Sequence, residues 1–252
     1  MSSHLSSIGL PVGSEREFWT LAQRVGPESA GLPVDAGTYF HWRDGSGAEL
    51  WLQVAGGDQF VGMNPHYAGD SAVPARLTQR LPAADGSPFD GGFRAFIDPG
   101  EGADAAPVVF DCPDFLRHGR LDLPADVLLQ VAAFAHELDV FDSAEVFAEA
   151  QAEAAEAGAP TLSDRFFVAA GLLDAPDAGD LPEARAVFTG HVLASAERAN
   201  GLTGRRFYWA LVETAGGTYD VVADASLVPG GVPPVGGVVS GSFWLSGRVR
   251  TD

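Results

Sequence analysis

The chain has 252 residues, of which 46 % are apolar, and a formal net charge of −19. This excess of negative charge opposes binding to nucleic-acid phosphates and to anionic membrane surfaces. All 15 basic residues are arginine, which excludes any site that needs a lysine, including a pyridoxal-phosphate Schiff base. A single cysteine, Cys112, excludes an internal disulfide and a cysteine-based metal site. With no basic neighbour in sequence, it is predicted to be an inert small apolar residue.

Length and composition favour a soluble chain of one large or two small domains. The 31 glycines and 17 prolines indicate many turns, which is typical of β-rich structure. The N-terminal residues 1–8 contain no basic segment followed by an apolar run, so we expect no secretory signal. No run of about eighteen apolar residues is present. We therefore expect a cytoplasmic protein.

Residues 4–67 are predicted to form a strand, a helix and two or three antiparallel strands. Ser14 is a good helix N-cap, and apolar residues at helical spacing follow it as far as the stop at Gly26–Pro27. A hairpin turn is predicted at Asp44–Gly47. The expected strands are His4–Val12, Gly37–Arg43, Ala48–Val54 and Phe60–Tyr67.

The middle of the chain is less regular. Val127–Val140 suits either a helix or a strand, and we favour a strand, followed by a helix that begins after the cap residue Ser143. An acidic loop is expected at Asp98–Asp104. The polar, proline-bearing stretch Asp174–Pro182 is predicted to separate two domains. The other expected strands are Val73–Leu81, Gly92–Ile97, Pro107–Asp111 and Arg165–Leu173.

Beyond residue 184 the sequence predicts four strands, at Ala184–Ser195, Arg205–Thr214, Thr218–Ala223 and Val238–Arg248. In the last of them, apolar residues alternate with polar ones, and internal glycines predict a curved strand. Trp244 is the exception on the polar face, and we expect it to pack against the N-terminal part. In strand count and length this region weakly resembles an oligonucleotide/oligosaccharide-binding (OB-type) barrel.

The predicted element order of residues 4–67 resembles a vicinal-oxygen-chelate (glyoxalase-like) module. The resemblance implies a metal ligand on the first strand, where His4 stands in His4-Leu-Ser-Ser-Ile-Gly-Leu, and a glutamate on the last strand, where Glu49 could serve. Such modules come in pairs, so residues from about 71 to 173 could form a second one, with His136 near the ligand position. No matching second glutamate follows His136.

The expected fold class is therefore α+β and β-rich. A glyoxalase-like βαβββ domain would span residues 1–175, as half-modules 4–67 and about 71–173, and a small antiparallel β-barrel would span residues 184–252. The phrases Pro107-Val-Val-Phe-Asp-Cys-Pro-Asp-Phe and Ser240-Gly-Ser-Phe-Trp-Leu-Ser-Gly-Arg also resemble an uncharacterised family of bacterial proteins, which implies no activity.

Two functional hypotheses follow. The favoured one is a non-catalytic binding or interaction protein. The alternative is an enzyme in which His4, Glu49 and His136 hold a divalent metal that polarises a small bidentate substrate. A small-molecule ligand and a homodimer are compatible with either hypothesis, whereas the charge argues against nucleic acid and membranes.

Overall fold

The computed structural model describes residues 4–84, 86–97, 105–173 and 181–250. The predicted loop at Asp98–Asp104 and most of the predicted boundary at Asp174–Pro182 lie outside these residues. The described helices are two α-helices of more than ten residues, one short α-helix and four 3-10 helices. Their bounds are α1 Glu15–Val25, α2 Ala144–Glu156, α3 Ala170–Leu173, η1 Ser6–Ile8, η2 Gly26–Glu28, η3 Phe115–His118 and η4 Ala225–Leu227.

The first of two sheets in the described residues is an antiparallel meander of four strands in chain order. The hairpin turn at Asp44–Gly47 forms as predicted, and the side chain of Asp44 accepts a hydrogen bond from the Ser46 amide (2.8 Å). The Ser14 side chain caps α1, also as predicted. The strands are β1 Ala30–Val34, β2 Gly37–Arg43, β3 Ala48–Ala55 and β4 Gln59–Tyr67.

The second described sheet has nine strands, in the order β11-β12-β8-β5-β6-β7-β13-β10-β9. Residues 127–140 are a strand, as we favoured, and α2 follows with the Ser143 side chain as its cap. The strands are β5 Val73–Pro82, β6 Gly91–Ile97, β7 Ala106–Asp111, β8 Ala125–Phe141, β9 Phe167–Val168, β10 Arg185–Ala199, β11 Arg206–Thr214, β12 Gly217–Asp224 and β13 Val238–Val249.

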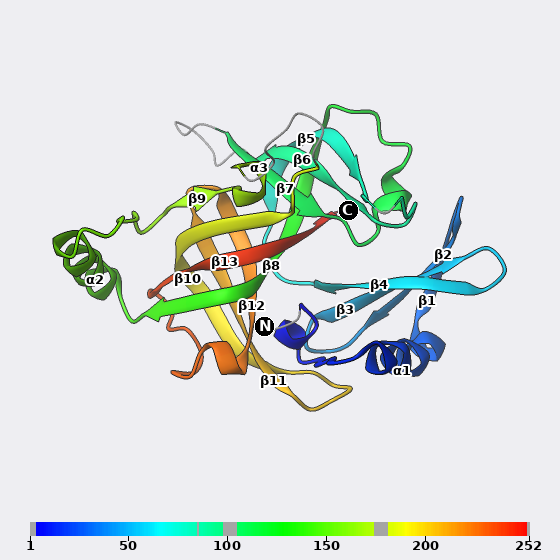
Figure 1. The fold of residues 1–252 in the computed structure, drawn as a ribbon, viewed down its shortest axis with the longest axis horizontal. Coiled ribbons are helices and arrows are strands. Elements are labelled where there is room, and N and C mark those ends of the chain that lie inside the picture. The colour runs from blue at the N-terminus through cyan, green and yellow to red at the C-terminus, as the bar shows by residue number, and fades with distance from the viewer. Residues whose placement is uncertain (1–3, 85, 98–104, 174–180, 251–252) are drawn as a thin grey trace.

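Two additional pairings close this sheet upon itself. Strand β11 pairs with β10, and the long strands β8 and β13 pair with each other. The second half of β8 and the first half of β13 therefore belong to a ring with β12, β11 and β10. Their other halves belong to a ring with β5, β6 and β7. The two rings lie end to end along the β8–β13 ribbon, which crosses the centre of the molecule (Figure 1).

One hydrophobic core runs through both rings. The same face of β8 supplies Leu129, Val131 and Ala133, which pack in a single cluster with Phe110 of one ring and Phe188 of the other. The opposite face of β8, with Ala132 and Phe134, packs in a second cluster with residues of α1 and of the four-stranded sheet. The four-stranded sheet therefore lies beside the rings (Figure 1), with its edge strand β4 close to β13.

Three predicted elements need correction. Residues 4–12 contain the 3-10 helix η1 where a strand was expected, so the first strand of the chain is β1. The expected strand Arg165–Leu173 shortens to β9 followed by α3. The strands after residue 184 do not close a barrel alone, because the fifth member of their ring is β8. Sequence periodicity predicts which face of a strand is buried, but it does not predict which other strand pairs along its edge.

The β-rich α+β class agrees with the structure. Strands from both sides of the predicted boundary at residues 174–182 pair within one sheet. In the described ranges, no helix combines the length and the apolar character that crossing a membrane would require.

Candidate functional site

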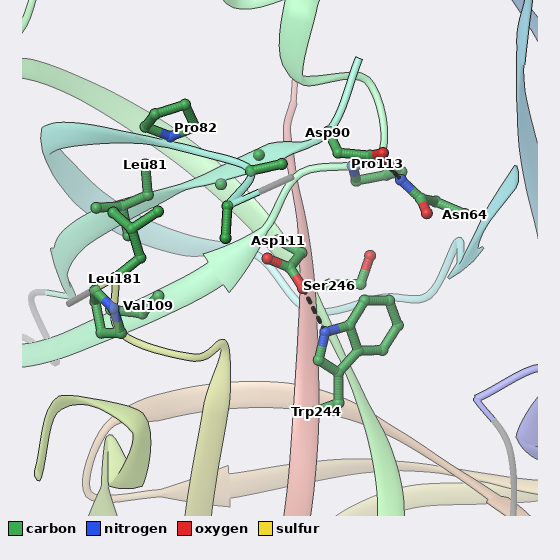
Figure 2. A pocket seen from close by; sticks show the side chains of 15 residues that line it. Asn64, Leu81, Pro82, Asp90, Val109, Asp111, Pro113, Leu181, Trp244 and Ser246 are labelled. Carbon is green, nitrogen blue, oxygen red and sulfur yellow. Dashed lines mark hydrogen bonds between the residues drawn. The ribbon is translucent and has the colours of Figure 1, made fainter. Parts of the chain in front are cut away.

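A pocket of about 450 Å³ lies where β4, β6, β7 and β13 come together. Its wall combines apolar side chains with two carboxylates and the indole of Trp244 (Figure 2). None of the lining residues is a histidine or an arginine. They are Asn64, Leu81, Pro82, Ala83, Ala84, Asp90, Gly91, Gly92, Val109, Asp111, Pro113, Leu181, Pro182, Trp244 and Ser246.

Strand pairing places Asp111 and Trp244 side by side in this wall. The last residue of β7, Asp111, pairs with Ser246 of β13, and Trp244 lies two residues away on the same face of β13. The Trp244 indole nitrogen donates a hydrogen bond of 2.6 Å to Oδ2 of Asp111. The other carboxylate oxygen of Asp111 points away from the indole (Figure 2). One oxygen is thus fixed by the protein while the second faces another part of the pocket.

The carboxylate of Asp90 is held differently. Its Oδ1 accepts hydrogen bonds from the side-chain amides of Gln53 (2.5 Å) and Asn64 (2.6 Å). These donors belong to β3 and β4, so Asp90 ties the four-stranded sheet to the loop before β6.

The surroundings of Asp111 weaken its acidity. Desolvation, with a smaller contribution from the charges of Asp90 and Glu183, raises the pKa of Asp111 to about 6 against the lowering effect of the Trp244 hydrogen bond. The side chain remains open to solvent within the pocket. A carboxyl group with this pKa is largely ionised at neutral pH and gains from a cationic partner.

Two of the three predicted metal-ligating residues lie together. The Nε2 atoms of His4 and His136 are 2.9 Å apart, and the His4 ring stacks on Trp244 with ring centroids 4.1 Å apart. Trp244 therefore packs on the N-terminal segment, as predicted. Burial, followed by the charge of His136, lowers the pKa of His4 to about 4. Burial is also the main cause that lowers the pKa of His136.

Glu49, the third predicted ligand, has other partners. Its carboxylate is 1 % exposed, lies 3.2 Å from His41 Nε2 and accepts a hydrogen bond of 3.4 Å from Arg248. Burial alone would raise the pKa of Glu49, but the contact with His41 and the charges of His66 and Arg248 lower it to about 2. Arg248 also stacks over the ring of Trp51, 4.6 Å from its centroid.

A buried polar network continues from this region into the rings. His66 Nε2 contacts the side-chain oxygen of Gln130 at 2.7 Å, and its Nδ1 contacts the Ser246 hydroxyl at 2.9 Å. Gln130 in turn donates to Asp220 (2.7 Å), which also accepts from the indole of Trp209 (2.9 Å). These groups join β4, β8, β11, β12 and β13 below the pocket.

Sequence reasoning missed Asp90 and Asp111 as pocket residues. The sequence predicted Asp111 only as the last residue of a strand, and Asp90 belongs to no recognisable functional motif. The one usable signal was Trp244 on a polar face, because a large aromatic side chain there needs a partner from elsewhere in the chain. Comparison of the chain with protein-family models, with curated proteins and with solved structures gives no match.

Proposed function

We propose that this protein is a non-catalytic binding protein that takes a small organic cation, such as a primary amine with an apolar group, into the Asp111–Trp244 pocket. The pairing of a carboxylate with an indole supports a ligand with a positively charged group, since both side chains attract positive charge. Leu81 and Val109 offer apolar contact to the rest of such a ligand. A volume of about 450 Å³ suits a small organic molecule.

The single observation that carries this proposal is the chemistry of the wall. Two carboxylates converge on a pocket in which none of the lining residues that the structure describes has a cationic side chain. An anionic ligand would meet repulsion there, in a chain with a net charge of −19. Asp90 already accepts two hydrogen bonds, which makes Asp111 the better partner for a ligand.

Titration of the full-length protein with phenethylamine, and with the neutral phenethyl alcohol as matched probe, tests the proposal. We expect the amine to shift the indole N–H resonance of Trp244, assigned with Trp244→Phe, and the alcohol to bind at least tenfold more weakly. Asp111→Asn should remove this preference. Asp126→Asn should preserve it, because Asp126 has a side chain that is 78 % exposed and pairs with Arg76 on the surface. Equal binding of the two probes, or an amine preference that survives Asp111→Asn, would contradict the proposal.

The second candidate function is a divalent-metal-dependent enzyme of the vicinal-oxygen-chelate type, acting on a small bidentate substrate. The contact between His4 and His136 favours it, because nitrogen ligands of one ion at about 2.0–2.1 Å lie roughly 2.9–3.3 Å apart. Both histidines are neutral at pH 7 and offer lone pairs. His4, Glu49 and His136 are not among the described groups whose ligand atoms all lie within 4.8 Å of one another, so Glu49 would have to leave Arg248 and move to reach the metal. The glyoxalase-like arrangement belongs to this candidate.

Metal uptake by the wild type, His4→Gln and Glu49→Gln measures this second candidate. An enzyme of this type requires one ion per chain that is lost in both variants. Metal uptake that is unchanged in both variants, or no metal uptake on reconstitution, would contradict this second candidate function.

A further inference from the structure

A cluster of three potential metal ligands, none of which lines the pocket or belongs to the predicted His4–Glu49–His136 set, lies between the end of β7 and η3. Cys112, Asp114 and His118 each offer one ligand atom, and these atoms all lie within 4.8 Å of one another. Of the described residues, this is the only group of three or more histidine, cysteine or acidic residues that meets this criterion. Cys112 is 1 % and Asp114 2 % exposed, while the His118 side chain is 14 % exposed.

One oxygen of Asp114 is the centre of the cluster. Its Oδ1 lies 3.3 Å from Cys112 Sγ and 3.3 Å from His118 Nε2. Bond lengths of about 2.0–2.3 Å from zinc to oxygen, nitrogen and sulfur give edges of roughly 3.3–3.5 Å between tetrahedral ligands. The two measured separations therefore match two edges of a zinc coordination shell.

The second oxygen of Asp114 is occupied by arginines. Arg117 Nη1 lies 3.3 Å and Arg248 Nη2 3.5 Å from Oδ2. These contacts orient the carboxylate and leave Oδ1 facing the thiol and the imidazole. Outer partners of this kind commonly fix the orientation of metal-ligating carboxylates.

The backbone around the cluster is also fixed. The Phe115 amide donates to the Cys112 carbonyl (3.1 Å), and the Arg117 amide donates to the Asp114 carbonyl (3.0 Å). The Cys112 amide donates to the Gly91 carbonyl of β6 (2.8 Å). From β5, Arg80 holds the carbonyls of His118 and Leu121. The backbone that carries the three ligand residues is thus held by hydrogen bonds to itself and to neighbouring strands.

We propose that Cys112, Asp114 and His118 form a binding site for a divalent transition metal, with zinc as the best fit. A thiolate, an imidazole and a carboxylate together suit zinc better than magnesium or calcium, which prefer oxygen ligands. With three protein ligands the fourth position is open to water, on the side where His118 reaches the surface. Binding displaces the thiol proton of Cys112, so one proton is released for each ion bound.

Cobalt titration of the full-length protein, freed of metal by a chelator and kept reduced, tests the site. Tetrahedral cobalt bound to a thiolate gives a sulfur-to-cobalt charge-transfer absorption in the near ultraviolet and intense bands in the visible. We expect one equivalent of cobalt per chain to produce both features and zinc to displace it. His118→Gln should weaken binding at least tenfold, as loss of a ligand does, and Cys112→Ser should abolish the charge-transfer band.

Two control variants separate this site from the other histidines. His191→Gln removes a partly exposed histidine that pairs with Asp164, and His4→Gln removes the contact with His136. Both should bind cobalt like the wild type. Because Cys112 belongs to the core and its substitution could unfold the chain, His118→Gln carries the test if Cys112→Ser is not folded.

The proposal is wrong if the protein binds no metal and Cys112 and His118 only form hydrogen bonds with Asp114. Cobalt would then give no charge-transfer band, and zinc would not raise the midpoint of thermal unfolding. A band that persists in His118→Gln with unchanged affinity would also overturn it. Cobalt uptake that disappears in His4→Gln would assign the metal to the His4–His136 pair instead.

Discussion

At the scale of single residues, burial decides how the histidines behave. His66 is 0 % exposed, and burial lowers its pKa to about 4. Gln130 Oε1 is an acceptor only, so the Nε2 of neutral His66 carries the proton and donates to it, and Nδ1 accepts from the Ser246 hydroxyl. A second proton, on Nδ1, would require the Ser246 hydroxyl to turn from donor to acceptor and would place a charge in a buried site.

This leads to a prediction on acid stability. The unfolded state, with a histidine pKa of about 6.5, binds more protons than the folded state between pH 6.5 and 4. The contribution of neutral His66, about 3 kcal/mol, is therefore present above pH 6.5 and lost as the pH falls through that window. Urea unfolding at pH 7, 5.5 and 4 should show a shallower loss of stability for His66→Leu than for wild type, and His191→Gln should match the wild type. Identical slopes for wild type and His66→Leu would contradict the prediction.

Asp220 is a second buried residue whose side chain is held by hydrogen bonds. It is 0 % exposed and accepts hydrogen bonds from the amides of Asp70 and Ser71 and from the side chains of Gln130 and Trp209. Both of its oxygens are acceptors in this network. An acid there cannot be replaced by an amide of the same shape without turning one acceptor into a donor.

Asp220→Asn should therefore lower the free energy of unfolding by about 3 kcal/mol, because the new NH₂ group faces donors. Asp126→Asn, on the surface, should change it by less than about 1 kcal/mol. Chemical denaturation of the two variants measures the difference. Equal stability of the two variants would show that the buried hydrogen-bond network does not need two acceptor oxygens at Asp220.

At the scale of secondary structure, the curvature of β13 depends on its glycines. The register between β8 and β13 shifts between Ser242 and Phe243, next to Gly241. A Cβ atom on Gly241 would lie 2.2 Å from the carbonyl oxygen of Glu137, which is backbone and cannot swing away. The glycine therefore allows the two long strands to approach at the bulge.

Gly241→Ala is expected to destabilise the protein by about 1–3 kcal/mol, since the ribbon must separate to admit the methyl group. Gly230→Ala is the matched control, because an added Cβ there meets no atom within 4 Å. Unfolding midpoints in urea compare the two substitutions. A Gly241→Ala protein as stable as Gly230→Ala would show that the ribbon tolerates the extra volume.

At the scale of the whole molecule, β8 and β13 join strands from both sides of the predicted domain boundary in one sheet. Strand β8 pairs with β13 from Leu129 to Phe141, and its other edge pairs with β5 and β12. The ring of β10 to β13 is thus incomplete without β8, which lies before the predicted boundary at residues 174–182. The His4–Trp244 stack links the N-terminal segment to the rings, and the Asp90 contacts link the four-stranded sheet to them.

A fragment of residues 181–252 should consequently fail to fold. Its far-ultraviolet circular dichroism and its amide NMR spectrum should be those of an unfolded chain, because β12 and β13 each lose their β8 partner. A fragment of residues 121–252, which contains β8, should recover ordered strands. Dispersed resonances and cooperative unfolding of the shorter fragment would contradict this view of the fold.

Much of the local structure follows from the sequence for physical reasons that act over short distances. Period-two alternation predicts β13, and a serine before an alanine-rich run predicts the start of α2. Residues 4–12 are the informative failure. Their apolar residues suit a strand, but Leu5, Ile8 and Leu10 are buried in the second core cluster around the 3-10 helix η1. Contacts across the chain there outweigh local propensity.

For the candidate sites, the sequence by itself determined which chemistries are excluded and which residue types are available. The proximity of His4 to His136, the partners of Glu49 and the alignment of Asp111 with Trp244 were decided only by tertiary structure. The single cysteine predicts that no cysteine-based metal site exists, and the proposed Cys112–Asp114–His118 site departs from that expectation. The exclusion considered cysteine alone, whereas the turn after β7 brings an aspartate and a histidine to the same place. Strand edges pair with partners far along the chain, and that pairing, which no local pattern encodes, brings the functional side chains together.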